Sequence, residues 1–114
     1  MIRNALYSWS SQALDGVQGG ANGVVMLRDG TMRGGNSFFY YVGSYGCFAE
    51  GRWKGEATIR EHSPAPATMP MAGGVNHIGF TGTYTDEDAE FEATALVGKR
   101  SLRYHVSLRV LIAD

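Results

Sequence analysis

Few side chains in this sequence combine the types and the spacing that catalysis or metal binding requires. The three histidines, His62, His77 and His105, lie far apart, and no cysteine pair accompanies them in a metal-ligand spacing. Ser10 stands in no nucleophile motif, and no basic helix start lies near Cys47 to activate its thiol. We therefore expect no metal site and no cofactor, and we predict that the protein is not an enzyme.

Carboxylates form the one dense charge cluster of the sequence, in a turn and along the segment that follows it. Its members are Asp86, Glu87, Asp88, Glu90 and Glu92. Two interpretations remain open. The carboxylates either pair with Arg103 or Arg109 across the last hairpin, or form an acidic patch that steers a basic protein partner.

An aromatic segment over residues 38–45 offers a second candidate surface. Rings occur on both faces of the strand expected there, so burying one face exposes the other. We expect Phe39, Tyr41 and Tyr45 on the exposed face, unless a loop covers them. Exposed aromatic surface of this kind marks interfaces, and the two-fold dimer is the commonest oligomer. The segment therefore predicts a homodimer.

The elements that must position these residues are strands. Apolar and polar residues alternate with period two almost throughout, which predicts about eight strands. Asp29-Gly30, between apolar runs, is typical of a tight hairpin with positive φ at both turn residues. Three prolines exclude a central strand between His62 and Gly74, and Val97–Arg100 is expected to form the last turn.

Sequential hairpins without helical crossovers favour an all-β, antiparallel up-and-down barrel, because closure removes exposed strand edges. A two-sheet sandwich is the alternative. Eight strands enclose a space that side chains just fill, or that holds one small ligand. Small inward residues either leave room for an apolar ligand or make room for neighbouring rings. The candidate cavity residues are Trp9, Trp53, Gly55, Ala57, Phe80, Phe91, Ala93, Ala95 and Tyr104.

Composition limits the remaining classes. The 114 residues predict a single domain over 1–114, with a core large enough to fold unaided. A net charge of −1 argues against a nucleic-acid partner, which normally requires an excess of Lys and Arg. No run approaches the ~20 apolar residues of a membrane helix, and no signal peptide is recognisable. Cys47 is the only cysteine, so we expect a reducing, cytoplasmic location.

Three segments resemble a known family. Asn4–Ser8, Gly23–Asn36 and Tyr40–Tyr45 match, in order and spacing, the opening strand, the Asp-Gly hairpin with its Gly-Gly step, and the aromatic strand of GrlR-type negative regulators of bacterial type III secretion. The resemblance implies a lipocalin-like, eight-stranded, dimeric barrel that acts by binding. It also implies a partner, a helix-turn-helix transcriptional activator, which such regulators sequester through an acidic turn after the aromatic strand.

The chain departs from the family in that acidic turn. The equivalent stretch, Gly46–Trp53, has one carboxylate, Glu50, and Arg52 has the opposite sign. The expected function is a non-catalytic, protein-binding regulator that sequesters a transcriptional activator. A lipocalin-like carrier or sensor of a small apolar ligand is the alternative.

Overall fold

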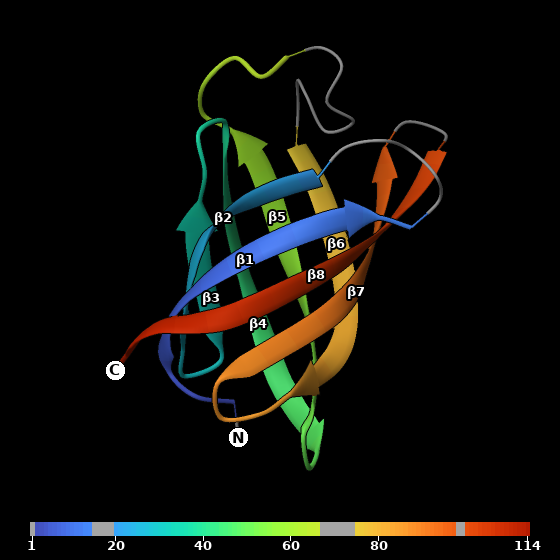
Figure 1. The fold of residues 1–114 in the computed structure, drawn as a ribbon. Coiled ribbons are helices and arrows are strands. Elements are labelled where there is room, and N and C mark those ends of the chain that lie inside the picture. Colours follow the sequence, from blue (N-terminus) through green and yellow to red (C-terminus); the bar gives the residue numbers. More distant parts are fainter. Residues whose placement is uncertain (1, 15–19, 67–74, 98–99) are drawn as a thin grey trace.

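The computed structural model describes residues 2–14, 20–66, 75–97 and 100–114. Eight antiparallel strands follow one another around a closed barrel (Figure 1). They are β1 (Ala5–Ala13), β2 (Gly20–Arg28), β3 (Thr31–Gly35), β4 (Phe39–Ala49), β5 (Arg52–Glu61), β6 (Val75–Tyr84), β7 (Asp88–Val97) and β8 (Arg100–Ala113). Because β8 pairs with β1, no sheet edge is left open, and the prediction of a barrel rather than a sandwich is confirmed.

The two ends of the barrel have different connections. Tight turns join β2 to β3, β4 to β5 and β6 to β7 at one end, the lower end in Figure 1, which we call the hairpin end. At the first of these turns Asp29 and Gly30 have φ values of 48° and 85°, as the Asp-Gly pair predicted. The Asn4 side chain accepts a hydrogen bond from the Asp29 backbone N–H at 3.0 Å and holds this turn in place.

We call the opposite end the loop end. The strand ends that the connections β1–β2, β3–β4, β5–β6 and β7–β8 join lie there. The connection expected between His62 and Gly74 and the turn expected over Val97–Arg100 lie partly outside the described residues. At the described start of the β5–β6 connection, the His62 backbone N–H donates to the Phe38 carbonyl at 2.8 Å. This hydrogen bond links the end of β5 to the β3–β4 connection.

The alternating pattern sets which side chains form the core. Tyr7, Leu27 and Trp53 are fully buried inside the barrel, and the polar residues between apolar positions face outward. The apolar faces that the period-two alternation predicts for β1, β2, β5, β6, β7 and β8 are the inward faces in the structure. No helix among the described residues is long and apolar enough to cross a membrane.

Strand β4 is where the expected orientation is wrong. Phe39 and Tyr45 are only 7% and 9% exposed, and Tyr41 is half-buried, so these rings face the interior rather than solvent. Tyr40 and Val42 occupy the outer face instead. Because rings occur on both faces of this segment, no contrast in polarity determines which face turns inward. The pairing register determines it, because Tyr41 pairs with the inward Ile59 of β5.

Candidate ligand-binding site

Aromatic rings fill the barrel interior toward the hairpin end. The Trp53 ring lies 5.0 Å from Phe80 and 5.7 Å from both Tyr45 and Phe91, centroid to centroid, in edge-to-face contacts. Its indole N–H donates to the Glu90 carbonyl at 3.1 Å. We call Tyr45, Trp53, Phe80 and Phe91 the aromatic plug.

Glycine makes room for this plug. A Cβ atom added to Gly55 would lie 2.6 Å from the Phe80 ring and 2.3 Å from the Ser44 carbonyl oxygen. At this position, the smallness of an inward residue accommodates a ring, which is the second of the two interpretations offered by the sequence. The interior at this level holds side chains, not a ligand.

The interior toward the loop end is different. Five large side chains point inward there and yet are only half-buried: Trp9, Tyr41, Ile59, Ile78 and Tyr104. We call these five residues the loop-end lining. Small residues stand opposite two of them, since Ala57 pairs with Ile78 and Ala93 pairs with Tyr104. These five side chains therefore line the interior near the loop end and keep some contact with solvent there.

Trp9 and Tyr41 form the most ordered part of this lining. Their rings lie 5.6 Å apart at 73°, and the Trp9 indole N–H donates to the Tyr41 hydroxyl. That hydroxyl donates in turn to the Val24 carbonyl at 2.8 Å. Burial raises the pKa of Tyr41 well above its usual range, so the phenol stays neutral.

Two glycines let the chain approach this pair closely. A Cβ atom on Gly34 would lie 2.7 Å from the Tyr41 ring, and one on Gly23 would lie 2.9 Å from the Tyr41 hydroxyl. The Gly-Gly step after the Asp-Gly turn therefore serves packing: it gives the Tyr41 ring its place against β2 and β3.

Polar groups are sparse at this level of the interior. Asn76 is 8% exposed and pairs with Ile59 of β5. Wherever exposure is described, every arginine and lysine of the chain is exposed. Nothing in that part of the chain would neutralise an anion held inside the barrel, so the lining suits an uncharged, mainly apolar molecule.

The nine candidate cavity residues are thus divided by the structure. Trp53, Gly55, Phe80 and Phe91 belong to the plug or its support, whereas Trp9, Ala57, Ala93, Ala95 and Tyr104 lie nearer the loop end. Sequence reasoning missed Tyr41, Ile59, Ile78 and Asn76 as lining residues. The alternation in the sequence puts Ile59 on the same face as Trp53 and Ile78 on the same face as Phe80. Tyr41, by contrast, is expected on the exposed face of β4, which is wrong.

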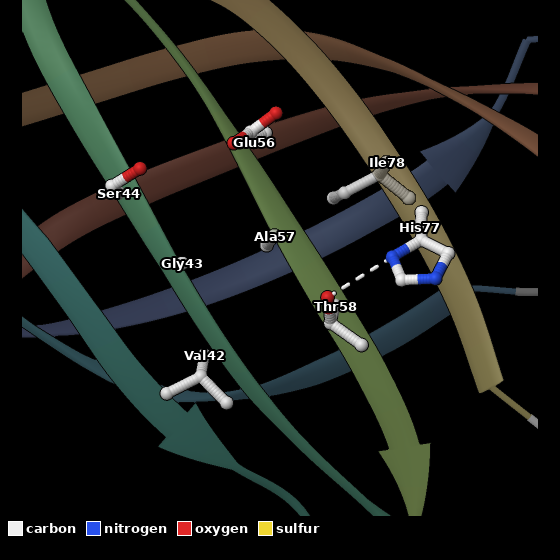
Figure 2. Close-up of a pocket in the computed structure, with 8 residues that line it drawn as sticks. All are labelled: Val42, Gly43, Ser44, Glu56, Ala57, Thr58, His77 and Ile78. Atoms are coloured by element: carbon white, nitrogen blue, oxygen red, sulfur yellow. Dashed lines mark hydrogen bonds between the residues drawn. The ribbon is translucent and has the colours of Figure 1, made fainter.

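A shallow depression of about 210 Å³ lies on the outer wall, across β4, β5 and β6 (Figure 2). Thr58 and His77 form one side of it through a hydrogen bond of 3.1 Å between Oγ1 and Nδ1. Ser44 and Glu56 contribute further polar groups, and the depression is open to solvent. It is separate in chemistry from the apolar lining inside.

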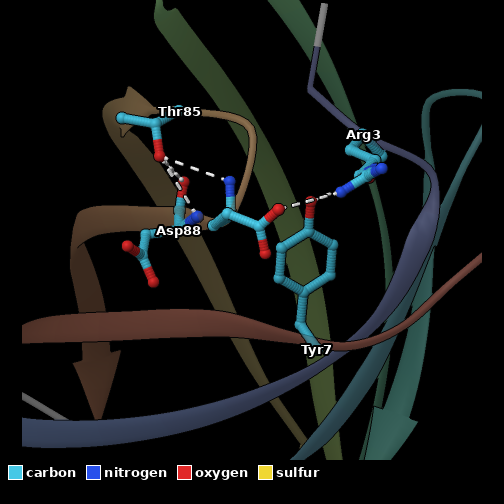
Figure 3. A network of polar contacts seen from close by, with 5 residues as sticks. Arg3, Tyr7, Thr85 and Asp88 are labelled. Carbon is cyan, nitrogen blue, oxygen red and sulfur yellow. Dashed lines mark hydrogen bonds and ion pairs between the residues drawn. The ribbon is translucent and has the colours of Figure 1, made fainter.

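The acidic turn is held by its own neighbours (Figure 3). The Thr85 hydroxyl accepts hydrogen bonds from the backbone N–H groups of Glu87 and Asp88, at 3.4 and 3.2 Å. Glu87 pairs with Arg3 at 3.2 Å, and Asp88 pairs with Arg109 at 3.6 Å. A role of Asp86, Glu87 and Asp88 in partner binding stays a prediction, with two of the three carboxylates already paired.

Further along the same hairpin the charges alternate across the strands. Glu92 pairs with Arg103 at 3.5 Å, and Glu90 lies 3.6 Å from the His105 ring nitrogen. Asp88 and Glu92 thus pair with arginines across the last hairpin, as the first of the two interpretations predicted. The partners in these two ion pairs are exposed, so each pair contributes little to stability.

Within the described ranges, no three His, Cys, Asp or Glu side chains gather as a metal site. Cys47 is half-buried beside the plug, and its hydrogen bond with Tyr84 raises the pKa of the Tyr84 hydroxyl. The structure thus places the thiol against apolar neighbours.

No model of a known protein family matches the chain, and no curated protein matches it either. Membership of the GrlR-type family stays a prediction. The stretch that corresponds to the acidic turn of that family, Gly46–Trp53, forms the tip of the β4–β5 hairpin.

Proposed function

We propose that this protein is a non-catalytic binding protein whose barrel takes up a small, uncharged, mainly apolar molecule from the loop end. One observation carries the proposal: Trp9, Ile59 and Ile78 point into a closed barrel and remain half-buried, while the plug residues are buried. Aromatic and aliphatic walls with few polar groups are the usual chemistry of small-molecule sites.

The two tryptophans provide the test, because one lies at each level of the interior. In a Trp53→Phe variant the only indole is Trp9, and in a Trp9→Phe variant it is Trp53. Bromododecanol, an uncharged probe whose bromine quenches indole on contact, is expected to quench Trp9 saturably and to leave Trp53 emission nearly unchanged. Bromododecanoate, its anionic counterpart, is expected to bind more weakly by about tenfold, because the anion must be desolvated without a partner.

A matched pair of variants on β7 locates the site. Ala95→Leu adds volume inside the barrel, whereas Thr94→Leu adds it on the outer face of the same strand. We expect the first to weaken bromododecanol binding and the second to leave it unchanged. If Ala95→Leu does not fold, Ile59→Phe fills the same level from a half-buried position and adds no indole to the quenching assay. Equal affinity in the inner and outer variants, or no quenching of Trp9, would contradict the proposal.

We propose the expected regulatory role as a second candidate, because an apolar strip lies on the outer wall. Val24, Tyr40 and Val42 are 42%, 41% and 42% exposed on β2 and β4, the strands on either side of β3. Exposed apolar surface of this kind, together with the resemblance to GrlR-type regulators, supports a homodimer or a complex with a transcriptional activator.

Sedimentation at micromolar concentration tests this second role. We expect a dimer that Val42→Glu dissociates, while Thr81→Glu, on the outer face of β6, leaves it intact. A monomeric wild-type protein would contradict the dimer without affecting the proposal of ligand uptake.

A further inference from the structure

The tip of the β4–β5 hairpin presents an exposed aromatic ring. Phe48 is 49% exposed, and the register between β4 and β5 shifts between Cys47 and Ala49, so Phe48 has no partner across the hairpin. A bulge of this kind redirects a side chain and interrupts strand pairing. Here it leaves the phenyl ring exposed at the hairpin end of the molecule.

Two cations are held against this ring. The guanidinium carbon of Arg52 lies 5.6 Å from the Phe48 ring centroid, and the ammonium nitrogen of Lys54 lies 5.5 Å from it. Both distances are those of cation–π contacts, which restrain a long side chain without neutralising its charge. Both positive charges thus lie close to the same ring.

Of the six other cations whose side chains the structure describes, Arg3, Arg28, Arg103 and Arg109 each lie within 3.6 Å of a carboxylate. Among the described residues, by contrast, no carboxylate forms an ion pair with Arg52 or Lys54. Their charge remains available to a carboxylate from outside.

We propose that Phe48, Arg52 and Lys54 form a docking site for an acidic segment of a partner protein, with an apolar side chain that packs on the exposed ring. Charge complementarity selects this occupant: two restrained cations match carboxylates, and the phenyl ring matches an apolar residue between them. The site is on the outside of the hairpin end, so it is independent of what the loop end takes up.

The surrounding charges favour a peptide over an anionic membrane. Glu50 lies at the tip of the same hairpin, and Glu56 lies further along β5 on the outer face. A membrane surface attracts clusters of several Lys and Arg, at about 1 kcal/mol each. Two cations with carboxylates on either side give a broad anionic surface little net attraction, whereas a narrow segment reaches the cations alone.

The test uses the whole chain and fluorescein-labelled peptides. One peptide consists of Asp, Glu and Leu, a second has Gly in place of Leu, and a third has Lys in place of the acids. We expect fluorescence anisotropy to show saturable binding of the first peptide, weaker binding of the second, and none of the third. The double variant Arg52→Glu/Lys54→Glu is expected to lose at least about tenfold in affinity, and Phe48→Ala about threefold or more.

Arg60→Glu is the matched control, because Arg60 is also exposed on β5 but lies at the other end of the strand. This control should keep wild-type affinity. Equal losses in Arg60→Glu and in the double variant would overturn the proposal, as would no saturable binding of the acidic Leu peptide. Stronger binding to phosphatidylglycerol vesicles than to the peptide would overturn it in favour of a membrane. Bromododecanol quenching should be normal in every variant, so a failure here leaves ligand uptake unaffected.

Discussion

The two ends of this barrel are built from the same eight strands, but their large inward side chains differ in burial. At the hairpin end, the plug rings pack edge to face, and the central one, Trp53, is fully buried. At the loop end, Trp9, Ile59 and Ile78 have the same inward direction but are half-buried. The three connections of the hairpin end are short, whereas the two longest connections in the sequence, β1–β2 and β5–β6, belong to the loop end.

The close-packed rings of the plug contribute apolar burial and leave no room for a ligand. The half-buried side chains of the loop-end lining bury less apolar surface and contribute less to stability. The proposed ligand uptake therefore uses the part of the barrel that contributes less to stability. The same division is common in proteins that place their binding residues near loops on a rigid scaffold.

The largest expected effect comes from removing the central ring of the plug. Trp53→Ala deletes a fully buried indole, its three ring contacts and its hydrogen bond to the Glu90 carbonyl, and should cost roughly 3–5 kcal/mol of unfolding free energy. Trp9→Ala deletes a half-buried indole and should cost about 1–2 kcal/mol. Urea unfolding followed by circular dichroism measures both variants without relying on tryptophan emission.

The difference between the two variants in lost unfolding free energy is the informative quantity. Equal costs at Trp53 and Trp9 would mean that the loop end is packed as tightly as the hairpin end. The division between a structural and a binding level would then be wrong. A larger loss at Trp9 would reverse it.

Most of the fold was predictable because its determinants are local. Asp29-Gly30 sets a hairpin through backbone conformation alone, and the alternation in Arg52–Arg60 sets a strand with one wet and one dry face. Closure follows from eight strands joined by sequential hairpins, since only the pairing of β8 with β1 satisfies both outer edges.

The candidate site was less predictable because its determinants are not local. In β4 both faces carry rings, so only pairing with β5 decides that Tyr41 is inward and Tyr40 outward. The role of Gly34 depends on a ring that comes from another strand. The plug and the lining also share one pattern, so the sequence placed Trp9 and Trp53 together although the barrel separates their environments.

A smaller effect on stability is expected at high pH, from the ionisation of Tyr7 at the hairpin end. Burial, more than any neighbouring charge, raises the pKa of Tyr7 to about 12, and its hydroxyl donates to the Arg3 carbonyl at 2.8 Å. In the unfolded chain the same hydroxyl ionises near pH 10. Its contribution to stability is therefore complete below pH 10 and is lost as the pH rises from 10 to 12. The loss should be on the order of 2 kcal/mol.

The Tyr7→Phe variant tests this expectation, because its curve of unfolding free energy against pH should cross that of the wild type. At pH 7 the variant should be less stable by about 1 kcal/mol, because the Arg3 carbonyl loses its hydrogen bond. The variant has no hydroxyl to ionise at this position, so its stability should fall less steeply between pH 10 and 12. Urea melts across this range are expected to show the deficit shrinking and then reversing. Parallel curves would mean that solvent reaches Tyr7 in the folded state, and the hairpin end would then not be the dry, structural half of the barrel.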